Sequence, residues 1–297
     1  MEVIRFTKAA DRIFDDRASF EQLTTGYFFT EGPVWDSKKD CLYFTNFQDN
    51  TIWLWSEEAG VSLYRRDSGR SVGLSMFRNG ELASAETKSH AVTIADSSAS
   101  RIIASQYDGK MLNSPNDVVV RRDGWVYFTD PYSVAMGDVR ELDFNGVYGV
   151  APVDGSIERG RIFLVDDGME RPNGIAFSPD ESVLYVNDTN RQLIQAYQMR
   201  EDGTTSLIGC FAKLDTGYGP GAADGMKVDV EGNVYLTGPG GVWVISPDGT
   251  PAAVLKTPEN VGNLCFGGKD DQTLFLAATS SVYRISVGIP GIIPERE

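Results

Sequence analysis

The chain has 297 residues, of which 41% are hydrophobic and 23% are charged, so it carries ample material for a folded core. Its 27 Lys and Arg residues are outnumbered by 42 Asp and Glu residues, and the resulting net charge of −15 makes nucleic acids and anionic membranes poor partners. No run of about 18 apolar residues occurs, which argues against a membrane-spanning helix.

The first 16 residues are too charged to contain the apolar stretch of a signal peptide, so we expect a cytoplasmic protein. A repeated unit of two short strands joined by a polar turn follows. The six copies read VWDSKKDCLYFTN from Val34, LSMFRNGELASAE from Leu74, VVVRRDGWVYFTD from Val118, IAFSPDESVLYVND from Ile175, MKVDVEGNVYLTG from Met226 and LCFGGKDDQTLFLAA from Leu264. After them we expect the third strands TIWLWS, AVTIAD, RIFLVD, IQAYQM, VWVIS and SVYRISV.

These units alternate apolar and polar residues and turn at Asp-Gly or Asn-Gly pairs, which is typical of antiparallel strands. Their starts lie 38 to 57 residues apart, a spacing that favours the blades of a β-propeller. We therefore predict an all-β fold, a six-bladed β-propeller that forms a single domain over residues 1–297. A β-sandwich with irregular hairpins is the alternative. Residues 12–30 are expected to supply an outer strand that closes the ring.

The longest segment between these expected strands runs from Asp130 to Val150 and is interpreted as a loop over one mouth of the channel. Tyr132, Arg140 and Tyr148 in this loop are the candidate substrate contacts. A purely solvated loop is the alternative for each of them.

Acidic or amide side chains stand just before the first strand of five units. They are Glu31, Asn116, Asn173, Asp224 and Asn263. In a propeller these positions ring one mouth of the central channel. Asn and Asp are also common in turns, but Glu31 has no turn-forming preference. Converging carboxylate and amide oxygens favour a hard divalent cation such as calcium, magnesium or manganese.

The three cysteines are far apart and odd in number, so neither a disulfide framework nor a structural zinc site is expected. His90 is the only histidine, which excludes a zinc site built from several histidines. Any catalysis must therefore depend mainly on carboxylates, amides and a hard metal ion.

The strings EGPVW, LNSPNDVVV, YFTDP, RPNGIAFSPD, ADGMKVD and NLCFGG occur in order from about Thr30 to about Arg284. This ordered set resembles the SMP-30/gluconolactonase/LRE family of six-bladed propeller hydrolases, and the resemblance covers nearly the whole chain. It implies that Glu31, Asn173 and Asp224 ligate a metal ion. It also implies that Asn116 either ligates the ion or binds water and substrate beside it.

The resemblance further implies hydrolysis of a sugar-acid (aldono-) lactone such as gluconolactone to the free acid. One divalent ion, calcium by first expectation and Mg²⁺, Mn²⁺, Zn²⁺ or Fe²⁺ otherwise, would polarise the lactone carbonyl and lower the pKa of the attacking water. Asp224 would act as general base. The expected partner is a small-molecule lactone, and the expected assembly is a monomer or a small homo-oligomer.

Some positions depart from the family pattern. Ser114 stands where regucalcin-type relatives have an arginine that holds sugar hydroxyls, and Val72 stands where gluconolactonases have an asparagine. The region around Asn263 lacks the histidine that supports a second calcium in diisopropyl fluorophosphatases, so one metal is expected. Two other functions stay open: a metal-dependent hydrolase of aryl esters or organophosphates, and a non-catalytic metal-binding propeller.

Overall fold

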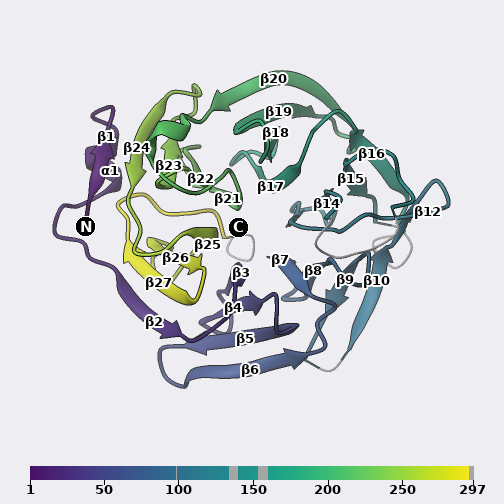
Figure 1. The fold of residues 1–297 in the computed structure, drawn as a ribbon, viewed down its shortest axis with the longest axis horizontal. Coiled ribbons are helices and arrows are strands. Elements are labelled where there is room, and N and C mark those ends of the chain that lie inside the picture. The colour runs from purple at the N-terminus through teal and green to yellow at the C-terminus, as the bar shows by residue number, and fades with distance from the viewer. Residues whose placement is uncertain (98, 134–139, 153–159, 294–297) are drawn as a thin grey trace.

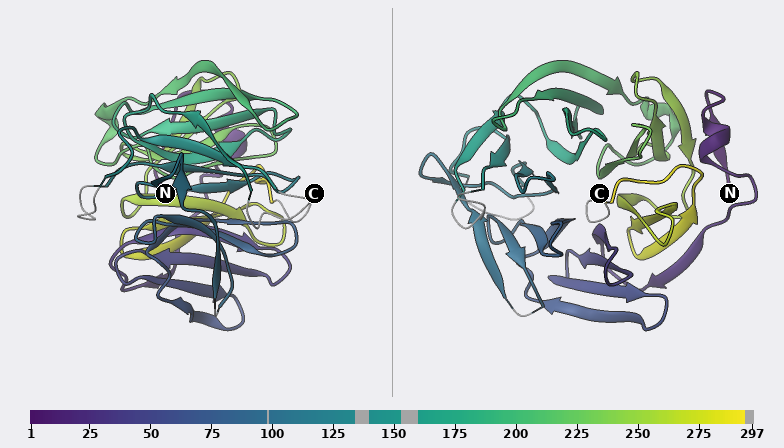
Figure 2. Two further views of the ribbon diagram at one scale, coloured as in Figure 1. Left: turned by 90° about the vertical axis from the view of Figure 1, so that its right-hand side faces the viewer. Right: turned by 180° about the vertical axis from the view of Figure 1, so that it is seen from behind.

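The computed structural model describes residues 1–97, 99–133, 140–152 and 160–293. Six antiparallel sheets surround a central axis, as Figure 1 and the reverse view in Figure 2 show. Blades 1 to 3 consist of β3 (Thr30–Asp36), β4 (Cys41–Asn46), β5 (Thr51–Ser56) and β6 (Gly60–Arg66); β7 (Ser71–Met76), β8 (Leu82–Glu86), β9 (Ala91–Ala95) and β10 (Ser100–Ala104); and β13 (Val118–Val120), β14 (Val126–Asp130), β15 (Gly146–Val150) and β16 (Ile162–Asp166).

Blades 4 to 6 follow the same plan and complete the ring. They consist of β17 (Pro172–Phe177), β18 (Val183–Asp188), β19 (Leu193–Met199) and β20 (Thr205–Lys213); β21 (Met226–Val228), β22 (Val234–Gly238), β23 (Gly241–Ile245) and β24 (Pro251–Leu255); and β25 (Val261–Gly267), β26 (Thr273–Ala278) and β27 (Ser281–Ser286). The first strands of neighbouring blades contact one another around the axis. The predicted six-bladed β-propeller is confirmed.

The N-terminal segment closes the ring by adding outer strands to the last two blades. Strand β2 (Glu21–Thr25) pairs with β27, and β1 (Val3–Arg5) pairs with β24. This confirms the expectation that residues 12–30 supply a closing strand. The remaining elements are short: α1 (Ala10–Ile13), the 3₁₀ turn η2 (Thr216–Tyr218), and a hairpin of β11 (Gln106–Tyr107) and β12 (Lys110–Met111).

The assignment of strands in blade 3 was wrong in one respect. The segment RIFLVD forms the fourth strand of this blade, β16, and the third strand is β15, Gly146–Val150. This strand lies within the segment that the sequence analysis interpreted as a loop. Its two glycines weaken the strand signal. Both sit against aromatic rings, because a Cβ on Gly149 would lie 2.1 Å from the Phe163 ring and a Cβ on Gly146 would lie 2.3 Å from the Tyr148 ring.

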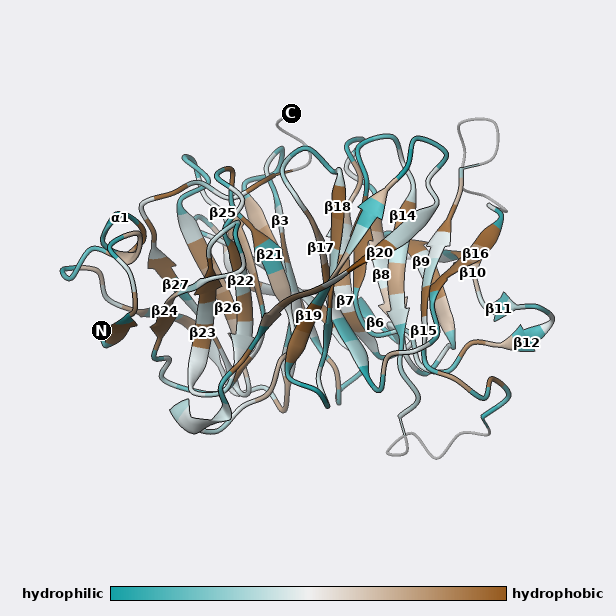
Figure 3. Cartoon of the chain, turned by 90° about the horizontal axis from the view of Figure 1, so that it is seen from above, coloured by the Kyte–Doolittle hydropathy of each residue, from teal (hydrophilic) through white to brown (hydrophobic). Residues whose placement is uncertain are grey.

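Aromatic side chains fill the space between blades. Trp35 of blade 1 stacks on Phe275 of blade 6 with ring centroids 5.2 Å apart, and Tyr127 meets Phe177 across blades 3 and 4 edge to face at 5.4 Å. Figure 3 shows hydrophobic segments along the strands, while the loops on the two faces are mainly hydrophilic. Among the described residues, no helix is long and apolar enough to cross a membrane.

Candidate metal centre and active site

Backbone hydrogen bonds between blades join the segments that lead into the inner strands. Gly73 N–H donates to Asn116 O (2.7 Å), which joins blade 2 to blade 3, and Gly225 N–H donates to Gly262 O (2.8 Å), which joins blade 5 to blade 6. Gly32 has a φ of +45°, and a Cβ there would lie 2.0 Å from the carbonyl oxygen of Val72. The mouth is therefore packed tightly enough to fix its side chains in place.

Three carboxylates gather at this mouth, close enough for the charges of Glu31 and Asp117 to raise the pKa of a neighbouring carboxylate. Glu31 is 2% exposed and accepts a hydrogen bond from Gly32 N–H (2.7 Å). Burial raises the pKa of Glu31 to about 7, and the nearby Asp117 charge adds to the rise. The pKa of Asp224 lies well above its ordinary range because of burial and of the Glu31 and Asp117 charges. Burial also raises the pKa of Asp117. Such a cluster is costly unless a cation compensates it.

The amide side chains divide into two groups. The Asn263 side chain is already used in hydrogen bonds within the protein. Its Oδ1 accepts from Leu264 N–H (2.9 Å), and the side chain also hydrogen bonds to Glu31 and Asp117. Asn173 donates through Nδ2 to Thr189 Oγ1 (3.0 Å) and also hydrogen bonds to the Asp224 carboxylate, which leaves its Oδ1 available. Asn116 takes part in hydrogen bonds through its backbone, and within the described residues its carboxamide makes none.

Two buried oxygens near this cluster have no hydrogen-bond partner in the described structure, Asp117 Oδ2 and Asn187 Oδ1. Asn187 is fully buried and donates through Nδ2 to the backbone oxygen of Asp224. Native proteins rarely leave such atoms unpaired. These two oxygens indicate that the mouth binds a polar or charged group, which supplies the partner that the protein itself does not provide.

The donor set fits a hard divalent cation. No three His, Cys, Asp or Glu side chains among the described residues are arranged to hold a metal by themselves, so amide oxygens would have to contribute. Glu31 and Asp224 offer carboxylates, and Asn116 and Asn173 offer amide oxygens that no hydrogen bond inside the described structure occupies. Oxygen-only sets of this kind suit calcium or magnesium better than zinc.

Lys227 lies deeper in the channel, on β21, and was not anticipated from the sequence. Its ammonium donates to Met226 O (3.0 Å), and its charge lowers the pKa of both Glu31 and Asp117. Met226 and Val228, the residues before and after it, are buried. The alternation of apolar and charged residues in this strand was therefore the sequence signal that could have identified Lys227. Asp117 was missed as well, although it directly follows Asn116.

The three candidate substrate contacts separate in the structure. Tyr132 and Arg140 lie together: the Arg140 guanidinium sits 5.2 Å from the Tyr132 ring centroid, and Asn145 Oδ1 accepts from Tyr132 N–H (2.9 Å) and from Arg140 (3.3 Å). Tyr148 does not join them. It is fully buried in β15 and packs against Phe128 with ring centroids 5.4 Å apart.

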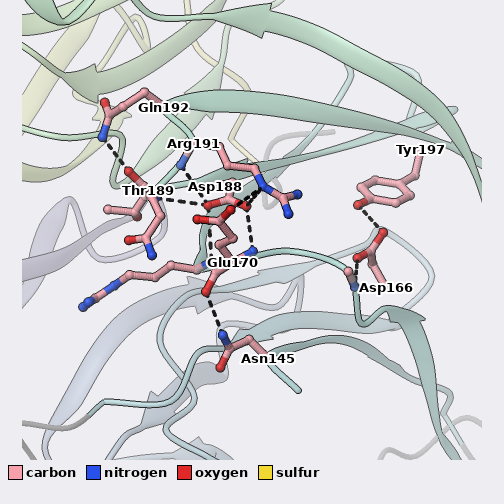
Figure 4. Close-up of polar contacts among 11 residues, drawn as sticks. Asn145, Asp166, Glu170, Asp188, Thr189, Arg191, Gln192 and Tyr197 are labelled. Atoms are coloured by element: carbon pink, nitrogen blue, oxygen red, sulfur yellow. Dashed lines mark hydrogen bonds and ion pairs between the residues drawn. The ribbon is translucent and has the colours of Figure 1, made fainter. Parts of the chain in front are cut away.

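A network behind this pair joins blade 3 to blade 4, as Figure 4 shows. Asn145 Nδ2 donates to Glu170 O (2.7 Å), and Glu170 N–H donates to Asp188 Oδ2 (2.8 Å). Asp188 is fully buried and also accepts from the backbone N–H groups of Arg171 (3.2 Å) and Arg191 (3.2 Å). The loops before β17 and after β18 are thus tied to one carboxylate.

The opposite end of the channel is different. A cavity of about 100 Å³ there is lined mainly by apolar side chains from the later residues of the inner strands, together with Ile292 and Ile293. Figure 1 shows the C-terminal part of the chain running to the centre of the ring. Cys265 lines this cavity, and burial raises the pKa of its thiol to about 12.

Comparison with known proteins places the chain in a family. Residues 29–280 match the family described as SMP-30/Gluconolactonase/LRE-like region. The chain is 31% identical to a gluconolactonase of Zymomonas mobilis, with 96% of this chain and 85% of that protein covered. It is 25% identical to the pentonolactonase XacC of Haloferax volcanii, covering 83% and 80% of the two chains. The structure of the gluconolactonase XC5397 of Xanthomonas campestris superposes with a TM-score of 0.84 at 28% identity, covering 96% and 94%.

Proposed function

The chain belongs to the SMP-30/gluconolactonase/LRE-like family, and we propose that it is a metal-dependent lactonase that hydrolyses a sugar-acid (aldono-) lactone such as gluconolactone to the free acid. Its similarity to a gluconolactonase and a pentonolactonase over most of their lengths supports a lactone-hydrolysing enzyme that acts on ester bonds. The observation that carries the metal dependence is the buried cluster of Glu31, Asp117 and Asp224 with unoccupied amide oxygens beside it.

We assign the metal ligands to Glu31, Asn173 and Asp224, with Asn116 either as a fourth ligand or as a contact to water and substrate beside the ion. A divalent ion bound there supplies electrophilic polarisation of the lactone carbonyl and acidifies water. Calcium is our first choice because the ligands are all oxygens and come from strand starts and loops of different blades, and calcium tolerates irregular geometry. We further propose that residues 1–297 form one domain that works as a monomer or a small homo-oligomer.

Asp224 performs the proton transfers in this proposal. Its carboxylate accepts a proton from the attacking water as the water oxygen bonds to the acyl carbon. It returns that proton to the ring oxygen as the bond between acyl carbon and ring oxygen breaks. The product is a hydroxy acid, which releases one proton to solvent at neutral pH. Asn187, which holds the backbone oxygen of Asp224, fixes the position of this base.

The groups at the rim of the mouth orient the substrate. The Asn116 carboxamide, which has no hydrogen bond within the described structure, is free to bind the lactone or a water beside it. Tyr132 and Arg140 are held as a pair by Asn145 and present an aromatic face and a guanidinium. Tyr148 is excluded from this role by its position in the core.

A pH-indicator assay of acid release tests this function directly. Chelator-treated protein is mixed with glucono-, galactono- and xylono-lactones and simple aliphatic lactones, and Ca²⁺, Mg²⁺, Mn²⁺, Zn²⁺ and Fe²⁺ are added back singly. We expect acid release above the spontaneous rate only with a metal present. Hydrolysis that proceeds unchanged in chelator would remove the metal from the proposal. Hydrolysis of aryl esters or phosphoesters but of no lactone would contradict the proposed lactonase activity and favour an esterase or phosphoesterase.

A further inference from the structure

Three arginines surround the mouth on blades 3 and 4, and two of them have partners. Arg191 Nε lies 3.1 Å from Glu170 Oε1 and 3.7 Å from Asp188 Oδ2, as Figure 4 shows. Arg140 is held on Tyr132 and Asn145, as described above. The third, Arg171, is exposed, and its guanidinium makes no ion pair or hydrogen bond in the described part of the chain.

The backbone of Arg171 is nevertheless fixed. Its N–H donates to the buried Asp188 carboxylate (3.2 Å), and its carbonyl oxygen accepts from Thr189 N–H (2.9 Å). Two residues later Asn173 stands in the mouth. The positive charge of Arg171 lowers the pKa of Asp224, in keeping with a guanidinium near the mouth. The Arg171 side chain thus starts from a fixed backbone position beside the site, and its guanidinium pairs with no anion in the described residues.

The charges at the mouth indicate which kind of ligand the Arg171 guanidinium attracts. The Lys227 ammonium and one divalent ion bound at the mouth would offset the three carboxylates of Glu31, Asp117 and Asp224, and Arg191 pairs with Glu170 and Asp188. The charge of Arg171 is offset by no ion pair in the described residues, and it lies at the solvent side of a site in a protein whose net charge is −15. A local excess of one sign attracts ligands of the other sign.

We propose that Arg171 is a specificity-determining residue that binds a second anionic group of the lactone, a carboxylate or a phosphate at the end of the substrate away from the ring carbonyl. This inference rests on the proposed function and names its substrate class. The guanidinium fork matches both groups with paired hydrogen bonds. The oxyanion of the reaction is not its target, because groups that stabilise an oxyanion act in water-excluded positions and Arg171 is exposed.

Matched lactones test the proposal. D-Glucono-1,4-lactone and D-glucaro-1,4-lactone share a ring and differ in a terminal hydroxymethyl or carboxylate group, and D-glucono-1,5-lactone is compared in the same way with its 6-phosphate. We expect the wild-type protein to have the higher kcat/KM on an anionic lactone of at least one pair, which identifies the anion. In Arg171→Gln the ratio of anionic to neutral kcat/KM should fall about 10- to 100-fold, mainly through KM, because a charge-assisted hydrogen bond is lost.

Two controls separate binding from a general effect. Arg171→Lys keeps the charge and should restore part of the ratio, while Arg66→Gln, an exposed arginine on the outer strand β6, should leave it unchanged. Raising the ionic strength from about 0.02 M to about 0.5 M should raise KM for the anionic lactone in the wild type but not in Arg171→Gln. Preference for both neutral lactones, or an equal loss on neutral and anionic lactones in Arg171→Gln, would overturn the proposal.

Failure of the proposed function would look different, since no lactone of either kind would then release acid. Arg171 can be tested in that case too, by calorimetric binding of D-glucarate and D-gluconate to the calcium-loaded protein. We expect Arg171→Gln to weaken D-glucarate binding about tenfold or more relative to D-gluconate. Equal affinity of the wild type and the variant for D-glucarate would contradict the assignment.

Discussion

The two ends of the central channel are built from the same six inner strands but have opposite chemistry. At one end, carboxylates and amides stand at or just before the start of five of these strands, and Asp117 Oδ2 among them has no hydrogen-bond partner in the described structure. At the other end, later residues of the same strands are mainly apolar and are joined by Ile292 and Ile293. The first end costs stability unless it binds a ligand, whereas the second contributes stability through burial. Changes at the two ends should therefore affect different measurements.

The largest expected effect is at the polar end, on Asp224. Asp224→Ala should lower kcat about 10³-fold or more and weaken calcium binding, because it removes both the proton acceptor and a ligand. Acid-release kinetics and calorimetric titration with calcium measure the two losses. Asp224→Asn should lose a comparable part of kcat while keeping more of the metal affinity. Turnover at the wild-type rate in Asp224→Ala would contradict the proposed mechanism.

A substitution at the apolar end should show the opposite pattern. Leu74 lines the cavity and is 1% exposed, so Leu74→Ala should lower the free energy of unfolding by about 2–5 kcal/mol through the cavity that it leaves. Denaturant unfolding measures this loss. The calcium Kd and kcat/KM of the folded protein should stay close to wild type. A large change in calcium affinity would show that the two ends are coupled.

Metal removal should make stability depend on pH at the polar end. Burial raises the pKa of Glu31 from its ordinary 4.5 to about 7, so the folded state holds this proton more tightly than the unfolded state does. The stabilisation is complete below about pH 4.5 and is lost as the pH rises toward about 7, a difference on the order of 3 kcal/mol. Unfolding in chelator should show this fall, and saturating calcium should remove it.

Glu31→Gln provides the matched control, because it cannot ionise. In chelator its stability should change less between pH 5 and pH 8 than that of the wild type. A wild-type profile that stays flat without metal would mean that another group compensates the Glu31 charge.

The smallest effect is expected at Asn116, which lies at the boundary between metal and substrate. Asn116→Ala should lower kcat/KM about tenfold and weaken calcium binding less than threefold, because one neutral ligand or substrate hydrogen bond is lost. Parallel kinetics and calcium titration give the two numbers. The reverse order, with metal affinity falling more than activity, would make Asn116 a primary ligand.

The sequence predicted most of the fold because strands carry a local signal. The short apolar and aromatic runs in Cys41–Asn46 and Thr273–Ala278 predicted strands without knowledge of their partners, and both strands are almost wholly buried. This signal failed at Gly146–Val150, where Gly149 makes room for the Phe163 ring and the two glycines interrupt the pattern. Tyr148 was consequently placed on a surface loop, although it belongs to the core.

The residue types at the mouth could also be predicted from the sequence, since each of Glu31, Asn173 and Asp224 stands at the start of a repeated unit. The hydrogen bonds of these residues could not be predicted. Asn263 holds Glu31 from the far end of the chain, and Asn187 holds the backbone of Asp224 from 37 residues away. Which amide oxygens stay available, and which arginine stays without a partner, depends on contacts of this kind. Closure of the ring brings these segments together, and only the tertiary structure records the distances that result.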